Sequence, residues 1–218
     1  MSDFTFEVLI AGEKHTHYAE EIANEMAESA KARGTGIAKR SPEYLQTKMR
    51  EGKAIIALEK KSQKVAGFCY IEVWQDQQYA ANSGLIVFPD FRKYGLATEI
   101  KEKAFELSRK KYPKAKLFGL TTSLAVMKIN SDLGYKPVPF SELTTDPSFW
   151  AGCKTCTNYE ILKSKENKMC LCTGMLYDPK EKQKDPPRHP FNEAVLKRLK
   201  KIKQALFLSK ILSFSFLS

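Results

Sequence analysis

The amino-acid sequence predicts a mixed α/β (α+β) fold, in which a mostly antiparallel central sheet is flanked by helices. Some segments repeat apolar residues at helical spacing, and others alternate or cluster them as strands do. Three strand candidates, 53–59, 65–74 and 79–87, follow one another across short polar breaks, which favours antiparallel pairing. The chain has 218 residues, enough for one substantial domain with additions.

The first 140 residues are expected to run in the order β-α-α-β-β-β-α-β-α-β. Ser41 followed by Pro42 is typical of a helix N-cap with proline at the first helical position, and Gly52 ends that helix. The expected strands are 4–10, 53–59, 65–74, 79–87, 116–122 and 135–139, and the expected helices are 17–33, 42–51, 96–111 and 125–133.

The remaining chain is expected to add a hairpin and a helical tail. Segments 158–162 and 169–177 have the pattern of two strands around the polar turn 163–168. Pro and Lys are frequent from 179 to 190, which indicates a linker. We therefore expect a domain over 1–178 (core 4–140, added hairpin region 141–178), a linker over 179–190, and a basic amphipathic helical tail over 191–218.

Positive charge is concentrated in the tail. The net charge is +11, and residues 180–218 contribute +7 of it, with ten Lys or Arg against three Asp or Glu. Basic residues and aromatics occupy separate blocks there, so nucleic-acid binding is not expected. The amphipathic face favours docking or self-association, and we expect a homodimer. No signal peptide or membrane span is apparent, and five cysteines fit reduced thiols in the cytoplasm.

The segment 85–98 leads from a strand into a helix and carries the strongest chemical signal. A helix start presents backbone N–H groups without intrahelical partners and a positive dipole end, so it suits a phosphate. Gly95 allows close backbone approach to an anion because it has no Cβ. Ala97 keeps the first helical turn free of bulk, while Arg92 and Lys93 add charge. These residues alone predict a pyrophosphate ligand.

The pattern Arg92-x-x-Gly95-x-Ala97 resembles the Arg/Gln-x-x-Gly-x-Gly/Ala signature of the GNAT superfamily, whose members are acetyl-coenzyme A-dependent N-acyltransferases. The triplet by itself is weak, because a strand-to-helix turn can need glycine only to relieve strain. Other phosphate motifs fit less well, since the chain has neither a G-x-G-x-x-G after its first strand nor a Gly-Lys-Ser/Thr loop.

The frame around the motif strengthens this resemblance. Leu85-x-Val87 lies on the preceding strand, and Pro89 follows two residues later. Gly134-Tyr135 stands where the family commonly has Gly-Phe before its sixth strand. The resemblance covers about residues 4–140, and agreement across the whole element order is what makes it specific.

The resemblance implies how the acyl donor binds. Backbone groups of Ile86 and Val87 are expected to pair with the pantetheine arm, and one N–H there to polarise the thioester oxygen. Loop N–H groups from Lys93 to Thr98 are expected to hold the pyrophosphate. The donor-site residues expected on this basis are Leu85, Ile86, Val87, Arg92, Lys93, Tyr94, Gly95, Leu96, Ala97, Thr98 and Ser123, the last standing where the family commonly has asparagine.

The acid and the base are less well defined. The family often supplies the acid as a tyrosine four residues before Gly-Phe, but Asn130 stands there and cannot act as an acid. Tyr135, Tyr94 and a water are the candidate substitutes. Glu72 is the first candidate base and Asp76 the second, although a strand carboxylate such as Glu72 can equally face solvent. The expected catalytic set is Glu72, Asn130 and Tyr135.

Four of the five cysteines form two pairs, Cys153-x-x-Cys156 and Cys170-x-Cys172. Together they would supply the four soft ligands of a tetrahedral zinc site. The spacing is imperfect, because C-x-C places both thiols on one face of a strand. A zinc site, a thiol-lined substrate wall and inert buried thiols all remain open, and no metal is assigned.

The expected function is transfer of an acetyl or other short acyl group from acyl-coenzyme A to a small primary amine by direct attack. The block from 149 to 178 resembles stand-alone GNAT proteins associated with bacterial arginine biosynthesis, which implies an amino acid such as glutamate as acceptor. The alternative is a non-catalytic acyl-coenzyme A sensor or an interaction module with a basic tail.

Overall fold

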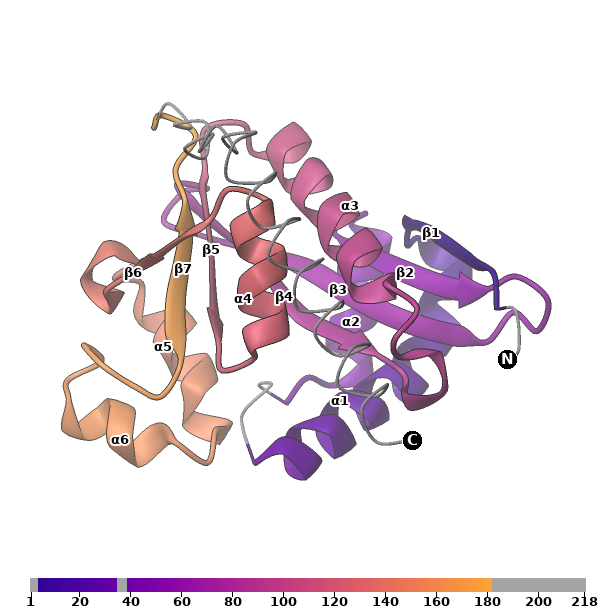
Figure 1. Ribbon diagram of the computed structural model, residues 1–218, viewed down its shortest axis with the longest axis horizontal. Helices are drawn as coiled ribbons and strands as arrows, with labels where there is room; N and C mark the ends of the chain where they lie inside the picture. The colour runs from indigo at the N-terminus through magenta and orange to yellow at the C-terminus, as the bar shows by residue number, and fades with distance from the viewer. Residues whose placement is uncertain (1–3, 35–38, 182–218) are drawn as a thin grey trace, which may run out of the picture. The chain divides into compact units, whose positions relative to one another are not determined.

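Figure 1 shows the computed structural model, which describes residues 4–34 and 39–181. Seven strands form one sheet in the order β1-β2-β3-β4-β5-β7-β6. Every pair of neighbours is antiparallel except β4 and β5, which confirms the predicted mixed, mostly antiparallel sheet. The strands are β1 (Phe6–Ile10), β2 (Ala54–Glu59), β3 (Val65–Trp74), β4 (Tyr79–Val87), β5 (Lys116–Thr121), β6 (Lys136–Val138) and β7 (Thr173–Tyr177).

Helices cover both faces of the sheet (Figure 1). On one face, α1 (Ala19–Arg33) follows the 3-10 turn η1 (Glu13–Tyr18) and packs beside α2 (Pro42–Arg50). On the other face lie α3 (Leu96–Lys111) and α4 (Leu124–Asp132). Each face has its own apolar core, so β3 and β4 are buried between two layers. The helix residues in these cores include Ile22, Met26, Leu45 and Met49 on the first face and Leu96, Ile100, Ala104 and Leu107 on the second.

Local sequence accounts for the helix ends. Ser41 caps α2, since its Oγ accepts a hydrogen bond from the Tyr44 N–H at 3.3 Å, and Pro42 occupies the first helical position. Ser123 caps α4 in the same way, accepting from the Val126 N–H at 3.4 Å. The cap at Ser41 was predicted from the sequence, whereas the cap at Ser123 was not.

The region after β6 differs from the prediction. Segment 158–162 is not a strand, because helix α6 (Tyr159–Ser164) occupies it, so the expected hairpin with 169–177 is wrong. Only β7 forms, and it lies between β5 and β6. The prediction failed because α6 has only six residues, with Leu162 buried. So short a segment does not show enough of its apolar spacing to distinguish a helix from a strand.

Short helices in this region build a third core against the sheet. They are η3 (Phe140–Glu142), α5 (Pro147–Ala151), η4 (Gly152–Thr155) and α6, and they lie beside one end of β7 in Figure 1. The core residues include Phe118, Phe140, Leu143, Trp150, Leu162 and Leu176. The Trp150 indole donates to the Thr144 carbonyl at 2.9 Å, which satisfies its buried N–H.

The described residues up to 181 belong to one compact unit. The predicted tail helix over 191–218 and most of the predicted linker lie outside the described residues. Within 4–34 and 39–181, no helix is both long and apolar enough to span a membrane.

Candidate active site

The site begins where β4 and β5 part. Their parallel pairing covers only three positions, from Tyr79↔Lys116 to Ala81↔Phe118. Beyond it β4 continues to Val87 and β5 to Thr121 without pairing to each other. A cavity of about 780 Å³ lies at this divergence, lined by residues 81–85 of β4 and 119–123 around the end of β5. Its size is that of a small-molecule site.

A β-bulge at Gly84 accompanies the divergence. Phe68 pairs with Ile86 but Tyr70 pairs with Ser83, so β4 carries one more residue than β3 here. Gly84 has φ +64°, and a Cβ on it would lie 2.4 Å from Tyr70 Cε1 and 2.9 Å from Met26 Cε. Only glycine fits this backbone, and a bulge bends the strand that carries it.

The loop between β4 and α3 presents free donors. It passes through η2 (Pro89–Phe91) and enters α3 at Gly95, which has φ +79°. Lys93 also has a positive φ, of 72°. Among the described residues, the backbone N–H groups of Lys93, Gly95, Leu96 and Ala97 have no hydrogen-bond acceptor. Four unsatisfied donors at the start of a 16-residue helix suit an anion.

The side chains of this loop have structural contacts. Arg92 donates from Nε to the Val87 carbonyl at 3.0 Å, and its Nη2 lies 3.2 Å from both Glu25 Oε1 and Ser29 Oγ. The Tyr94 ring packs edge-on to Phe4 with centroids 5.5 Å apart. Arg92 therefore ties the loop to β4 and α1, and its guanidinium is committed to those contacts. Residues 92–98 do not line the cavity itself.

Glu72 lies in the cavity on the face covered by α1 and α2. Its carboxylate is 14% exposed, accepts a short hydrogen bond from the Tyr44 hydroxyl, and lies 3.5 Å from Arg40 Nη2. Burial and the Glu72 charge raise the pKa of Tyr44, so this hydroxyl stays protonated and donates. Glu72 does not face open solvent. Asp76 instead lies in the turn after β3 and does not line the cavity.

The other two predicted catalytic residues, Asn130 and Tyr135, lie on the opposite face of the sheet, which α3 and α4 cover. Asn130 is 2% exposed and lines the cavity, and its Oδ1 has no hydrogen-bond donor among the described residues. Tyr135 is also 2% exposed but does not line the cavity. Its hydroxyl donates to Asn82 Oδ1 at 3.3 Å, and burial raises its pKa. The structure thus brings Asn130 to the cavity and keeps Tyr135 in the core.

Comparison with known proteins agrees with this geometry. Residues 23–127 match the family model described as Acetyltransferase (GNAT) family. This segment, just under half of the chain, thus resembles GNAT acetyltransferases. No curated protein sequence matches the chain.

Solved structures share the GNAT fold at low sequence identity. N-acetylglutamate synthase from Neisseria gonorrhoeae, complexed with coenzyme A and N-acetyl-glutamate, matches with TM-score 0.57 and 14% identity over 81% of this chain and 36% of that chain. The chain therefore spans about a third of that synthase. Rv2747 from Mycobacterium tuberculosis, solved with coenzyme A, has TM-score 0.56 and 14% identity over 79% of this chain and 98% of its own.

A third structure was solved with the acyl donor itself. It is yncA of Salmonella typhimurium, a putative acetyltransferase with its cofactor acetyl-CoA, with TM-score 0.53 and 12% identity over 84% of this chain and 99% of that chain. The family match and these coenzyme-bound neighbours support a transferase with an acyl-coenzyme A donor.

The cavity also has a buried lysine among its lining residues, which the sequence patterns did not single out. Lys101 on α3 is 2% exposed and lines the cavity, with its Nζ 5.3 Å from the centroid of the Tyr135 ring. No carboxylate pairs with it among the described residues. Burial lowers the pKa of Lys101 to about 8. The sequence contains one sign of this burial: Lys101 stands seven residues, or about two helical turns, before buried Ser108, at the edge of the apolar face of α3.

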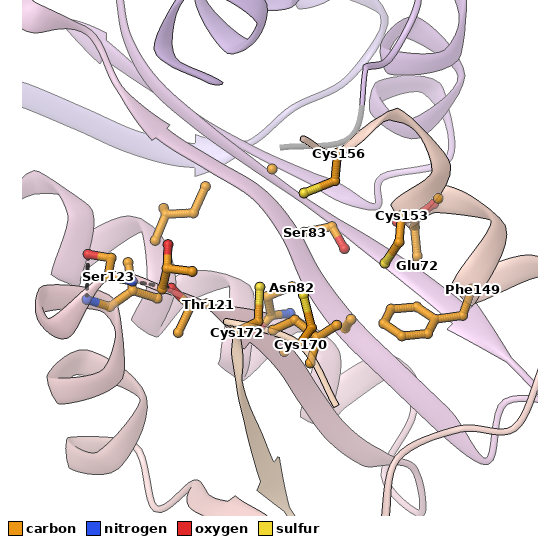
Figure 2. A pocket seen from close by; sticks show the side chains of 18 of the residues that line it. Glu72, Asn82, Ser83, Thr121, Ser123, Phe149, Cys153, Cys156, Cys170 and Cys172 are labelled. Atoms are coloured by element: carbon orange, nitrogen blue, oxygen red, sulfur yellow. Dashed lines mark hydrogen bonds between the residues drawn. The ribbon is translucent and has the colours of Figure 1, made fainter. Parts of the chain in front are cut away.

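The four paired cysteines line the cavity, and Figure 2 shows Cys153 near Glu72 and Phe149. Burial raises the pKa of Cys153 to about 11 and of Cys172 to about 12, so both thiols are neutral near pH 7. Among the residues that the structure describes, no three His, Cys, Asp or Glu side chains are grouped to hold a metal ion. Of the three interpretations, the thiol-lined wall agrees with this placement.

Proposed function

We propose that this protein is an N-acetyltransferase that moves an acetyl or other short acyl group from acyl-coenzyme A to a primary amine by direct attack. One observation carries the proposal: a single cavity passes between the parted strands and reaches both faces of the sheet. Asn130 and Lys101 line it on the α3 and α4 face, and Glu72 lines it on the other. Donor and acceptor can thus meet from opposite faces.

The donor half fits coenzyme A in two respects. The edge of β4 from Asn82 to Val87 is unpaired toward β5, so its backbone groups can bind the amides of the pantetheine arm. The unbonded N–H groups at the start of α3 suit the pyrophosphate. Arg92 acts through its contacts with Val87 and Glu25, which set the shape of this loop.

The acceptor half favours an amine that also carries a carboxylate, such as an amino acid. Arg40 is the cationic side chain that lines the cavity on this face among the described residues, and its side chain is 20% exposed. Glu72 beside it can take the proton of the amine, directly or through one water. The neutral thiols of Cys153 and Cys172 are poor nucleophiles, which argues against a covalent intermediate on either of them.

Gly95→Asp is expected to weaken acetyl-coenzyme A binding by more than about tenfold, because it places a carboxylate where the pyrophosphate is proposed to lie. A Cβ at Gly95 meets no atom within 4 Å, so the effect should come from charge and from strain at φ +79°. Isothermal calorimetry with acetyl-coenzyme A measures it.

Gly34→Asp is the matched control. Gly34 also has a positive φ, of 60°, and also meets no atom within 4 Å, but it ends a helix, α1, whereas Gly95 stands at the start of one. The Gly34→Asp variant should keep the wild-type affinity. Equal affinities for wild type and Gly95→Asp would contradict the proposed pyrophosphate site.

A further inference from the structure

We propose that Lys101 is a catalytic residue that donates a proton to the sulfur of coenzyme A as the thioester breaks. This inference rests on the proposed acyl transfer and assigns its acid. It places the proton donor on α3, whereas Asn130, which stands where the GNAT family often has a tyrosine, lies on α4.

The geometry places Lys101 at the cavity wall. Lys101 comes from the second turn of α3, whose first turn carries the unbonded N–H groups. Lys101 is 2% exposed, yet it is one of the residues that line the cavity. The Tyr135 ring lies under its Nζ and stabilises the cation. A pantetheine arm that runs from the start of α3 into the cavity would bring its sulfur toward this group.

The charge of Lys101 is otherwise unexplained. Burying an ammonium group without a carboxylate is costly, and such lysines are seldom kept for stability. The titratable groups that face it are Cys69 on β3 and Tyr135, and burial raises the pKa of both, so neither supplies a negative charge near pH 7. An anion that forms only during the reaction would satisfy Lys101, and the thiolate is such an anion.

The pKa of the Lys101 ammonium is also close to that of the thiol it would protonate. A thiol ordinarily has a pKa of about 8.5, and burial brings Lys101 to about 8. A general acid works best when its pKa lies near the operating pH and near that of the leaving group. At pH 7 most Lys101 side chains carry the proton. Tyr135, with a raised pKa and a hydroxyl committed to Asn82, is a weaker candidate.

The proposed reaction forms one bond, breaks another and moves two protons. The amine nitrogen forms a bond to the acyl carbon, and the carbon–sulfur bond breaks with its electron pair moving to sulfur. Lys101 Nζ gives a proton to that sulfur, which yields coenzyme A thiol and a neutral lysine. The nitrogen loses a proton to Glu72, and solvent returns Lys101 and Glu72 to their starting states.

Ionisation of bound coenzyme A tests the proposal without an acceptor. The full-length protein is saturated with coenzyme A, and thiolate absorbance in the ultraviolet is followed against pH, with desulfo-coenzyme A as the reference for protein absorbance. In wild type we expect the bound thiol to ionise at a lower pH than free coenzyme A, because the neighbouring Lys101 ammonium stabilises the thiolate. In Lys101→Met it should ionise at or above the free value. The same curve in both proteins would overturn the proposal.

Turnover supplies the second readout. Lys101→Met is expected to lower kcat by about 10²–10⁴-fold with little change in acetyl-coenzyme A affinity. Lys101→Arg keeps the charge but cannot release a proton, so it should retain the thiolate shift and still lose turnover. Lys110→Met, on the exposed face of the same helix, should match wild type.

The outcomes separate the two proposals. Wild-type protein that fails to bind coenzyme A contradicts the proposed function itself. If the Lys101→Met variant transfers acetyl groups as fast as wild type, only the assignment of Lys101 is contradicted. If Lys101→Met does not fold, Lys101→Arg alone decides, because retained turnover in that variant rules out proton donation.

Discussion

Glu72→Gln is expected to lower kcat by about 10²–10⁴-fold while acetyl-coenzyme A binds as in wild type. The amide keeps the shape of the carboxylate but cannot accept the proton of the attacking amine. It can still accept the Tyr44 hydrogen bond, although it loses the ion pair with Arg40. Steady-state kinetics with a working acceptor, together with calorimetry for the donor, separates the two effects.

Asp76→Asn is the matched control for this variant. Asp76 is a carboxylate close in sequence to Glu72, but it lies in the turn after β3 and outside the cavity lining. Its variant should keep wild-type turnover. A large loss in Asp76→Asn together with an active Glu72→Gln would assign the base to the turn and contradict the placement of Glu72.

Gly84→Ala is expected to destabilise the protein by about 2–6 kcal/mol. A residue with a side chain costs about 1–3 kcal/mol in the left-handed region, and overpacking a filled core adds about 1–3 kcal/mol. Both terms apply, since φ is +64° and the added Cβ would lie 2.4 Å from Tyr70 Cε1. Tyr70 is buried and bonded to Arg40 Nε at 3.0 Å, so it cannot easily move aside. Denaturant unfolding measures the loss.

Gly119→Ala offers a close comparison on the neighbouring strand. Gly119 lies on β5 and lines the same cavity, but a Cβ there meets no atom within 4 Å and its φ is not positive. This variant should unfold at nearly the wild-type denaturant concentration. Equal stability of the two variants would show that the bulge tolerates a side chain and that glycine is not required at position 84.

The sequence predicted the central elements because their patterns are long. Strands β3 and β4 and helix α3 have the bounds expected from alternation and helical spacing. The parting of β4 and β5 could not be predicted in this way. It depends on a bulge at Gly84 that is set by contacts with Tyr70 and Met26 from distant segments.

The candidate site was predicted unevenly for the same reason. The donor loop is continuous in sequence, so its glycine and helix start could be recognised together. The acceptor side draws Arg40, Glu72 and Cys153 from separate parts of the chain, and no local pattern joins them. Lys101 was overlooked because a lysine on a helix is ordinarily solvated, and only the folded structure, with Nζ over the Tyr135 ring, shows that this one is buried.

Thiol release is the most direct test of the central claim. The full-length protein is incubated with acetyl-coenzyme A and a panel of amines that includes amino acids such as glutamate, and free thiol and acetylated amine are both quantified. We expect one amine class to release coenzyme A thiol in a one-to-one ratio with its acetylated product, at a rate that Glu72→Gln lowers. Tight binding of acetyl-coenzyme A with no thiol release above the amine-free rate for any amine would contradict the account and identify the protein as a sensor.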